Sequence, residues 1–309
     1  MNQESDVFTI IGGGFGIYGY LPALVTVFGR RVILPEKYNE VVRARPELSE
    51  YFSSIHWEST LDGAIAKATG VVLAVPPKEQ VRQLGRLANF TNLKKIVVEK
   101  PIAVDPKSAF EIIRCFADRK LQVRVGYIFQ YCDWLEGLKL QVSRSSAEIE
   151  INWTFTADHI FRDRDTWKRY HSLGGGVLRF YGIHLLAVLA SLGYNSVEGS
   201  GLVFDCEDQP TVWKAQFAGR GLPALSVYVS LLGPSDSFSI VSKDPLGNRT
   251  VCCERLSPLP ALNQQDTPDV RIDLLDKILR SFSDEDSTLQ KWYQNTNLLW
   301  ERVESASTV

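Results

Sequence analysis

The stretch Val97-Val98-Glu99-Lys100-Pro101 places a lysine between an acid and a proline at the end of an apolar run. Residues 96–98 are consecutive β-branched residues, which is typical of a buried strand in a parallel sheet. Ligands gather at the carboxyl ends of such strands. A lysine placed there could stabilise the negative charge on a carbonyl oxygen as the carbonyl accepts a hydride. Lys100 is therefore the first candidate catalytic residue.

Glycines crowd the stretch after the first apolar run, where Ile10-Ile11 leads into Gly12-Gly13-Gly14-Phe15-Gly16-Ile17-Tyr18-Gly19. In a strand-to-helix turn, glycines allow a tight bend and let backbone amides approach a pyrophosphate at the helix N-terminus. Two registers fit: Gly12-x-Gly14 with Ile17 in third place, or Gly14-x-Gly16-x-x-Gly19. We prefer the first because the turn should begin where the strand ends. The predicted cofactor-binding residues of this loop are Gly12, Gly14, Phe15, Gly16 and Ile17.

Two residues after the second apolar run bear on the choice of cofactor. The run at 31–34 is followed by Pro35, Glu36 and Lys37. An acid at this place binds the adenosine ribose of NAD, whereas a base favours the 2′-phosphate of NADP. Glu36 and Lys37 point to opposite answers, so NAD and NADP are both candidate cofactors.

The elements that would position these residues form a regular series. Short apolar runs alternate with amphipathic segments of helical length from residue 7 to about 124. This alternation indicates βαβ units and a doubly wound parallel sheet, because parallel strands need a crossover helix. We predict a Rossmann dinucleotide-binding domain over residues 1–124.

The pattern changes after residue 145. Residues 147–155 alternate between polar and apolar, as in a half-exposed strand, and a leucine-rich helix is predicted after Gly174. Further strand-like runs lie at 201–204, 212–217, 225–231 and 238–241, and a proline-rich loop at 257–268 precedes a helical region at 269–283. Residues 125–309 are therefore predicted to form an α+β domain with a mostly antiparallel open sheet and helices on one face.

Composition limits the classes of partner. The chain has 309 residues and a formal net charge of −2, which argues against nucleic acid or an anionic membrane as the main partner. No apolar stretch approaches the roughly 20 residues of a membrane span, and the N-terminus lacks the pattern of a signal peptide. The five cysteines are scattered, which favours reduced thiols and a cytoplasmic protein. No histidines have metal-ligand spacing, so no catalytic metal is predicted.

Three further motifs complete a pattern with the glycine loop. They are Ala74-Val75-Pro76-Pro77, then Val98-Glu99-Lys100-Pro101-Ile102-Ala103, then the stretch from Gly174-Gly175-Gly176 to His184. In this order the chain resembles the Gfo/Idh/MocA family of NAD(P)-dependent oxidoreductases over nearly its whole length. The resemblance implies a Rossmann domain followed by an α/β domain, whose open sheet often forms the interface of a homodimer or homotetramer.

The resemblance also implies roles for individual residues. Lys100 would bond the reacting oxygen, His184 would donate or accept a proton, and the nicotinamide would lie between them. Cofactor contacts are implied at Val75, Pro76, Pro77, Glu99, Lys100 and Pro101. The Lys100–Pro101 peptide bond is expected to be cis, as it often is in similar proteins.

This chain departs from the family pattern on the distal helix. The family usually has an aspartate four residues before the histidine, where this chain has Phe180. Because residues four apart share a helix face, an apolar ring is expected beside His184. Gln80 and Tyr20 also stand where histidines are common in the family. Tyr181 and Tyr127 are candidate proton donors in place of the missing carboxylate, and for each a packing role is an equal alternative.

The segment 162–171 precedes the glycine triplet and is rich in cations. In the family this region helps to form the substrate pocket and often holds a tryptophan followed by a base, as in Trp167-Lys168. We assign Arg162, Trp167, Lys168 and Phe180 to substrate binding. A substrate with a carboxylate or phosphate would suit this cluster, and a solvated loop with local ion pairs is the alternative.

These features predict an NAD(P)-dependent oxidoreductase that acts on a carbonyl or hydroxyl group of a small, sugar-like or nucleotide-sugar substrate, in carbohydrate metabolism. Ketone reduction is favoured, because a lysine with a tyrosine or histidine can polarise and protonate a carbonyl without a carboxylate. Two alternatives remain. One is an imine reductase of the thiazolinyl imine reductase type, and the other is a non-catalytic dinucleotide-binding sensor of the same fold.

Overall fold

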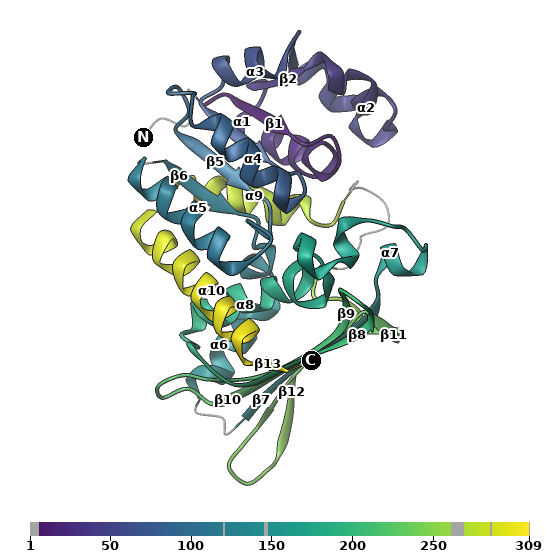
Figure 1. The fold of residues 1–309 in the computed structure, drawn as a ribbon, viewed down its shortest axis with the longest axis vertical. Coiled ribbons are helices and arrows are strands. Elements are labelled where there is room, and N and C mark those ends of the chain that lie inside the picture. Colours follow the sequence, from purple (N-terminus) through teal and green to yellow (C-terminus); the bar gives the residue numbers. More distant parts are fainter. Residues whose placement is uncertain (1–5, 120, 145–147, 261–268, 285, 309) are drawn as a thin grey trace. The chain divides into compact units, whose positions relative to one another are not determined.

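The computed structural model describes residues 6–119, 121–144, 148–260, 269–284 and 286–308. The N-terminal segment expected to lack a signal peptide, residue 147 of the first expected strand of the second half, and most of the loop expected at 257–268 lie outside these residues. Contacts divide the chain into two compact units (Figure 1). The first unit is Met1–Ile102, Ile112–Ile128 and Ala261–Gln290, and the second is Ala103–Glu111, Phe129–Pro260 and Lys291–Val309.

A six-stranded parallel sheet forms the centre of the first unit. Its strands are β1 (Phe8–Ile11), β2 (Val32–Pro35), β3 (Ile55–Glu58), β4 (Gly70–Leu73), β5 (Lys95–Val98) and β6 (Gln122–Val125). The order is β3-β2-β1-β4-β5-β6. The apolar side chains of β1, β4 and β5 are buried, as expected for strands covered on both faces. The strand order reverses between β1 and β4, and such a switch point is where open α/β sheets bind ligands.

Five helices lie between these strands along the chain: α1 (Leu21–Phe28), α2 (Asn39–Arg43), α3 (Leu61–Lys67), α4 (Pro77–Leu87) and α5 (Pro106–Asp118). A further helix of the first unit, α9 (Ile272–Arg280), comes from the C-terminal part of the chain. Short 3₁₀ segments span Glu36–Tyr38, Pro46–Ser54, Ile128–Tyr131 and Ser281–Ser283, and a π-helical turn, Gly16–Tyr20, precedes α1. The predicted Rossmann-like fold is confirmed.

The second unit is built on a seven-stranded sheet. Its strands are β7 (Glu148–Thr156), β8 (Ser196–Cys206), β9 (Gln209–Ala218), β10 (Ala224–Ser230), β11 (Leu232–Lys243), β12 (Arg249–Arg255) and β13 (Ser307–Thr308). The order is β12-β11-β7-β10-β9-β8-β13, and the β7–β10 and β8–β13 pairs are parallel while the others are antiparallel. The predicted mostly antiparallel open sheet is confirmed.

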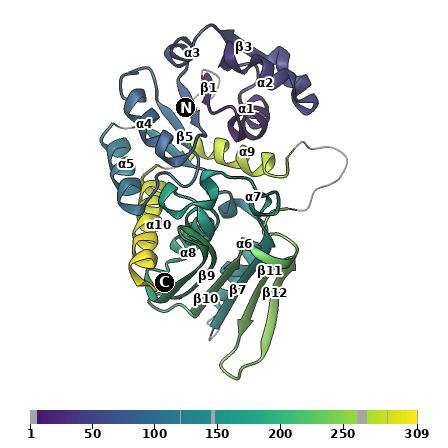
Figure 2. The same ribbon diagram turned by 45° about the vertical axis from the view of Figure 1, so that its right-hand side comes forward.

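The helices of this part of the chain are α6 (Trp134–Ser143), α7 (Asp158–Phe161), α8 (Ile183–Leu192) and α10 (Asp286–Ala306), whose first residues are assigned to the first unit. There are also 3₁₀ turns at Trp167–Arg169 and His171–Leu173 and a π-helical turn at Val177–Gly182. In Figures 1 and 2, α6, α8 and α10 lie on the same side of the strands. Every α8 residue from Ile183 to Ala190 is buried, so this helix is the centre of the second core.

The contacts divide the chain differently from the expected division at residue 124. The first unit extends to Ile128 and takes back residues 261–290 from the C-terminal part of the chain. The reason is α9, whose apolar residues are buried in the first unit, where the helix packs against α1. Residues 103–111 belong to the second unit.

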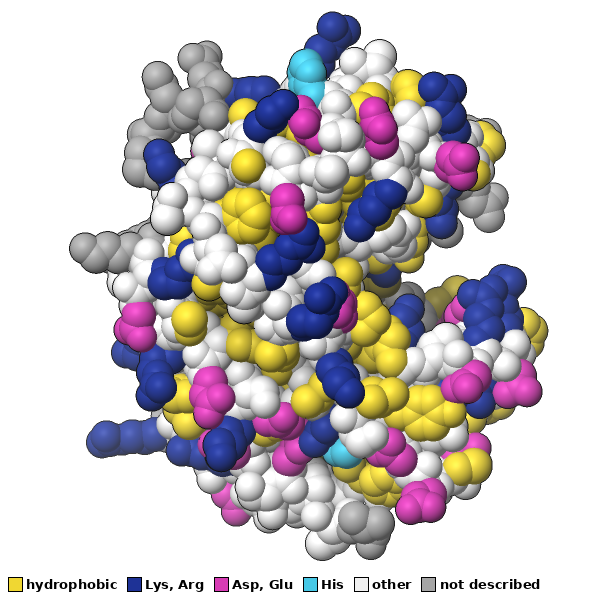
Figure 3. Space-filling model, turned by 45° about the horizontal axis from the view of Figure 1, so that its top comes forward, with side chains coloured by type: hydrophobic (Ala, Val, Ile, Leu, Met, Phe, Trp, Pro, Cys, Tyr) yellow, Lys and Arg dark blue, Asp and Glu magenta, His cyan; other side chains and the backbone are white. Residues whose placement is uncertain are grey.

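The surface carries both signs of charge. On the face shown in Figure 3, lysine and arginine side chains are interspersed with aspartate and glutamate side chains. Within the described ranges, no helix has the length and hydropathy needed to cross a membrane. The same ranges contain no group of three or more His, Cys, Asp or Glu side chains arranged to hold a metal ion.

Candidate functional site

The glycine turn begins at Gly12, directly after β1. Gly12 has a φ of +137°, and a Cβ placed on it would lie 2.1 Å from the carbonyl oxygen of Ala74. Both the backbone conformation and the close approach of the segment after β4 therefore exclude a side chain at position 12. The tight turn thus starts where the strand ends, which is the position that the first glycine register requires.

The rest of the loop divides into packed and exposed residues. A Cβ on Gly16 would lie 2.8 Å from Cγ2 of Ile10, so Gly16 lets the helix pack closely on the strand. Ile17 is fully buried, and Phe15 packs edge-on against Tyr18 and Tyr20. Gly14 is exposed, and a Cβ there would meet no protein atom within 4 Å. The loop therefore leaves open space beside Gly14, at the start of the helical segment, where a phosphate could approach the backbone.

The end of β2 presents a tyrosine to the glycine turn. The backbone N–H of Gly12 donates a hydrogen bond of 2.9 Å to the hydroxyl of Tyr38, and burial raises the pKa of this hydroxyl. The predicted residues Glu36 and Lys37 are both exposed, and the Lys37 ammonium lies 5.0 Å from the centre of the Tyr38 ring. Sequence reasoning missed Tyr38, which lies one residue beyond the acid–base pair. Glu36 and Lys37 thus present opposite charges next to each other, and neither NAD nor NADP is favoured.

The strand ends that should carry the site are joined at one edge of the sheet. Backbone hydrogen bonds run from Ala74 N to Ile11 O, from Glu99 N to Leu73 O and from Gly126 N to Val98 O, each of 2.9 Å. They tie the segments after β1, β4, β5 and β6 together in order. The predicted residues Val75, Pro76 and Pro77 lie after β4, and Glu99, Lys100 and Pro101 lie after β5. The Lys100–Pro101 peptide bond is cis, as expected.

Gln80 holds the segment that carries Lys100. Its side chain is fully buried, and its Nε2 donates to the carbonyl oxygens of Glu99 at 2.9 Å and Pro101 at 2.8 Å. The amide side chain therefore fixes the backbone on both sides of Lys100, which is half-buried. Gln80 was noted in the sequence as a departure from the family, and nothing in the sequence reveals this bridging role.

The carboxylate of Glu99, the residue before Lys100, is closely surrounded by other residues of the first unit. The Tyr20 hydroxyl donates a hydrogen bond of 2.5 Å to its carboxylate, and a Cβ on Gly126 would lie 2.4 Å from the same oxygen. Loss of solvent raises the pKa of Glu99, and the charge of Lys100 opposes that rise. The cation of Lys100 therefore favours the ionised form of the acid that precedes it in the Glu-Lys-Pro motif, against the effect of burial.

Tyr127 follows β6 and is 1% exposed. Its side chain is therefore buried. This burial favours the packing alternative that the sequence left open for this tyrosine.

In the second unit, His184 lies in the first turn of α8. It is 4% exposed, and its ring stacks on Phe129 with a centroid distance of 4.6 Å and an interplanar angle of 19°. Phe129 also contacts Trp153, and Trp153 contacts Tyr181. His184 and Tyr181 are therefore joined by a continuous series of aromatic rings.

Phe180 lies among aromatic and cationic side chains of the second unit. Phe180 packs edge-on against Trp167 at 5.2 Å and Tyr181 at 4.7 Å, and the Lys168 ammonium lies 5.1 Å from its centroid. Residues Val177–Gly182 are wound as a π-helix. Phe180 thus makes these contacts from a π-helical turn rather than from an α-helix. Trp167, Lys168 and Phe180, all assigned to substrate binding, are brought together.

Tyr181 has a partner that sequence reasoning missed. Its hydroxyl lies 3.3 Å from Nδ1 of His159, and the two rings are nearly parallel. His159 is 5% exposed. Burial, and then the charges of Lys168 and Arg169, lower the pKa of His159 to about 4. Burial also raises the pKa of Tyr181, so that at neutral pH a neutral imidazole faces a protonated phenol.

The cations of the 162–171 segment are largely neutralised nearby. Arg162 pairs with Asp158 at 2.6 Å, Arg164 with the same carboxylate at 3.4 Å, and Arg169 with Asp163 at 2.9 Å. Arg162 is exposed, so its ion pair contributes little to stability. This geometry favours the solvated-loop alternative for Arg162.

Because the pKa of His159 is low in the folded chain, the free energy of unfolding should depend on pH. The unfolded imidazole titrates near 6.5 and the folded one near 4. Between these values the unfolded chain binds the proton and the folded chain does not, so the free energy of unfolding falls as the pH drops from 6.5 towards 4. His159→Gln removes this contribution. Urea denaturation at about pH 7 and pH 4.5 should show a smaller acid loss in the variant, and equal losses would contradict the assignment.

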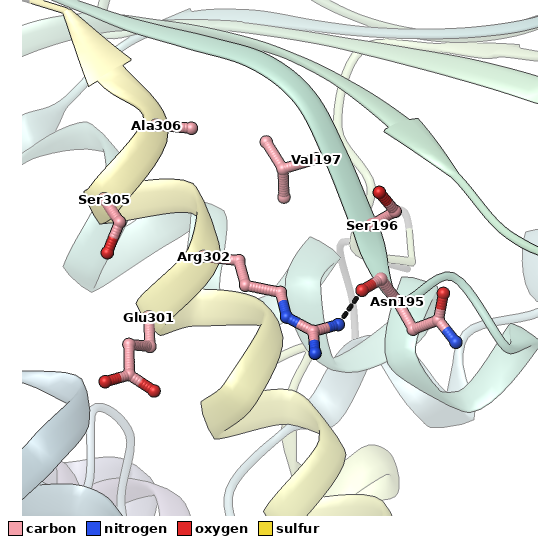
Figure 4. A pocket seen from close by; sticks show the side chains of 7 residues that line it. All are labelled: Asn195, Ser196, Val197, Glu301, Arg302, Ser305 and Ala306. Atoms are coloured by element: carbon pink, nitrogen blue, oxygen red, sulfur yellow. Dashed lines mark hydrogen bonds between the residues drawn. The ribbon is translucent and has the colours of Figure 1, made fainter.

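An open pocket of the second unit is lined by none of these residues. It has a volume of about 780 Å³ and lies between the end of α10 and the start of β8 (Figure 4). Its lining residues are Asn195, Ser196, Val197, Glu301, Arg302, Ser305 and Ala306. Arg302 reaches across it to donate to the carbonyl oxygen of Asn195. The cavity holds none of the predicted site residues.

Comparison with known proteins gives structural matches without sequence matches. No protein-family model and no curated protein sequence matches the chain. GenD2 from gentamicin A biosynthesis, solved in complex with NAD, aligns with a TM-score of 0.72 and 16% identity over 99% of this chain and 94% of its own. The WlbA dehydrogenase from Bordetella pertussis, in complex with NADH and UDP-GlcNAcA, aligns with a TM-score of 0.68 and 16% identity over 99% and 97%.

A third matching structure is described as a repressor. The super-repressor mutant of Gal80p from Saccharomyces cerevisiae aligns with a TM-score of 0.69 and 14% identity, over 97% of this chain and 94% of its own. At these identities the likeness shows the fold. The two-part fold implied by the resemblance to Gfo/Idh/MocA oxidoreductases is therefore confirmed over nearly the full length of the chain.

Proposed function

We propose that this protein is an NAD(P)-dependent oxidoreductase that reduces a ketone on a sugar-like or nucleotide-sugar substrate. The observation that supports this most strongly is the construction of one sheet edge. Gly12 makes the tight turn after β1, Gly14 leaves open space beside the loop, and Gln80 fixes the backbone around Lys100. Two proteins of the same fold were solved with NAD or NADH, and one of them also with a nucleotide sugar.

The residues of the first unit fit a dinucleotide. The open space at Gly14 precedes the helical segment that continues into α1, so the backbone amides there can receive a pyrophosphate. Bound nicotinamide would supply the hydride. Lys100, which follows β5 beside Glu99, would stabilise the negative charge that forms on the carbonyl oxygen. Glu36 and Lys37 favour opposite cofactors, so the proposal covers both NAD and NADP.

The second unit supplies the candidates for proton transfer. A protonated Tyr181 suits the reductive direction, because the alkoxide that forms must receive a proton. His184 is the candidate implied by the family resemblance, and its burial against Phe129 fixes the orientation of its ring. Trp167, Lys168 and Phe180 form a mixed aromatic and cationic cluster that suits a flat or anionic group on the substrate.

The test is an assay of NADH and NADPH oxidation with a panel of keto sugars and nucleotide-linked keto sugars, extended by a cyclic imine. Turnover of a keto sugar with either cofactor supports the proposal. Turnover of the imine alone would assign the chain to imine reduction, against which the intact Lys100 counts. Tight binding of NADH or NADPH without any turnover would favour a sensor, an alternative that the match to Gal80p keeps open.

The bare face of the second sheet is the proposed surface for a homodimer or homotetramer. A groove of about 470 Å³ crosses it, lined by residues of β7, β8, β9 and β10 that include Asn152, Lys214, Ser226 and Tyr228. Ser226→Arg places a charged side chain in the centre of this face. Light scattering should show an oligomer for the native chain and a smaller species for the variant. An unchanged mass for Ser226→Arg would place the interface elsewhere.

A further inference from the structure

A small cavity in the second unit lies beside His159. Its volume is about 30 Å³, which is enough for one water molecule. It is lined by His159, Ile160, Arg169, Asp205, Gln209, Pro210, Thr211 and Leu231. Most of these residues are polar, and a buried water needs two to four polar partners.

Two of the lining residues carry buried nitrogen atoms that lack a hydrogen-bond partner. Within the described part of the chain, neither Nε2 of His159 nor Nε of Arg169 has one. Another nitrogen of each side chain is engaged: Nη2 of Arg169 donates to the carbonyl oxygen of His159 and to Asp163, each at 2.9 Å, and Nδ1 of His159 lies 3.3 Å from the Tyr181 hydroxyl. Buried polar atoms in native proteins are almost always paired, either with protein or with ordered water. Both atoms therefore point to a water molecule in this cavity.

The opposite side of the His159 ring faces Tyr181. Its Nδ1 lies 3.3 Å from the tyrosine hydroxyl, so one imidazole connects this hydroxyl with the cavity. An imidazole can accept a proton at one nitrogen while it releases another from the second nitrogen. Asp205, another lining residue, is exposed and brings solvent near the cavity.

We propose that this cavity holds one water molecule and that His159 relays a proton from it to Tyr181 during ketone reduction. The relay rests on the proposed function, whereas the water site does not. As hydride adds to the carbonyl carbon, the electron pair of the C=O π bond moves to oxygen, and Tyr181 gives its hydroxyl proton to that oxygen. The tyrosine oxygen takes the proton of His159 Nδ1, and Nε2 takes one from the water. The hydroxide left behind accepts a proton from solvent, so one proton enters for each alcohol formed.

The charges around His159 favour a neutral imidazole between turnovers. Lys168 and Arg169 disfavour a positive imidazole, while Asp158 favours it and is the weaker influence. Arg169 also stands where it can donate to the cavity water and stabilise its hydroxide form. His159 is thus a positioning and relay residue, and Tyr181 is the group that would touch the substrate.

The water site is tested with the full chain and water itself as the probe, by nuclear magnetic resonance on ¹⁵N- and ¹³C-histidine-labelled protein. We expect a cross-peak between the His159 ring and a long-lived water, together with an imidazole that stays neutral between about pH 8 and pH 5. A dry cavity, or a cationic ring in that range, would overturn the proposal. This arm needs neither cofactor nor substrate, so it is decided even if the proposed function fails.

The relay is tested with a ketone that the oxidation assay identifies. His159→Ala should lower kcat by about tenfold or more with little change in KM, and added imidazole should restore part of the loss. His171→Ala is the matched control, because His171 is a second shielded histidine of the same unit that lies beside Glu304. Equal effects of the two variants, or no rescue by imidazole, would overturn the relay while leaving the reductase intact.

Discussion

Replacing Lys100 with alanine is expected to lower ketone reduction by about 10²- to 10³-fold while binding of NADH or NADPH changes little. The variant removes the cation that would stabilise negative charge on the carbonyl oxygen, and that charge is largest in the transition state. The loss should therefore appear in kcat more than in KM. The segment around Lys100 should keep its conformation, because Gln80 holds it through the backbone carbonyls of Glu99 and Pro101.

The matched control for this variant is Lys94→Ala. Lys94 is exposed and immediately precedes β5, at the end of the strand opposite to Lys100. Steady-state kinetics and a cofactor titration on both variants decide the matter. If Lys100→Ala kept the turnover of Lys94→Ala, the lysine would have no part in the chemistry, and a sensor would become the better account.

Alanine at Gly12 and at Gly14 should give two different defects. At Gly12 the new Cβ would lie 2.1 Å from the Ala74 carbonyl oxygen at a φ of +137°, so the variant should lose about 2 kcal/mol or more of stability. At Gly14 the Cβ meets no protein atom within 4 Å, so thermal stability should be retained. If the backbone of Gly14 approaches the pyrophosphate, however, its Cβ would stand in the way of the cofactor. Affinity for NADH should then fall by about tenfold or more.

Gly85→Ala is the control for both glycine variants. Gly85 is an exposed residue in α4 with no protein atom within 4 Å of an added Cβ, and alanine is the better helix former. This variant should be at least as stable as the native chain and should bind cofactor normally. Thermal melts and fluorescence titration on the three variants measure both quantities. Unimpaired binding by Gly14→Ala would contradict the placing of a pyrophosphate at this loop.

Local patterns in the sequence were sufficient to predict the strand-to-helix turn at Gly12 and the strand that ends before Lys100. Both depend on a few consecutive residues, and the physical rule in each case concerns those residues alone. Contacts between distant residues could not be obtained in this way. The hydrogen bond from Tyr20 to Glu99 joins residues 79 positions apart, and the pairing of Tyr181 with His159 joins residues 22 apart.

Two other elements, α10 and β3, have local sequence patterns too weak to predict them. The helix α10 buries Thr296 and Asn297 among its apolar residues, so its buried face does not read as an apolar stripe. The strand β3 has four residues with mixed polarity. The helix α9 was expected, yet its packing in the first unit depends on contacts with α1 that no short segment encodes.

We expect the glycine turn and the Lys100 segment to bind a nicotinamide dinucleotide, which a fluorescence titration of the purified chain with NADH and NADPH measures. At least one of the two should bind saturably, with one molecule per chain and with the affinity reduced in Gly14→Ala. Failure of a well-folded chain to bind either dinucleotide would contradict it.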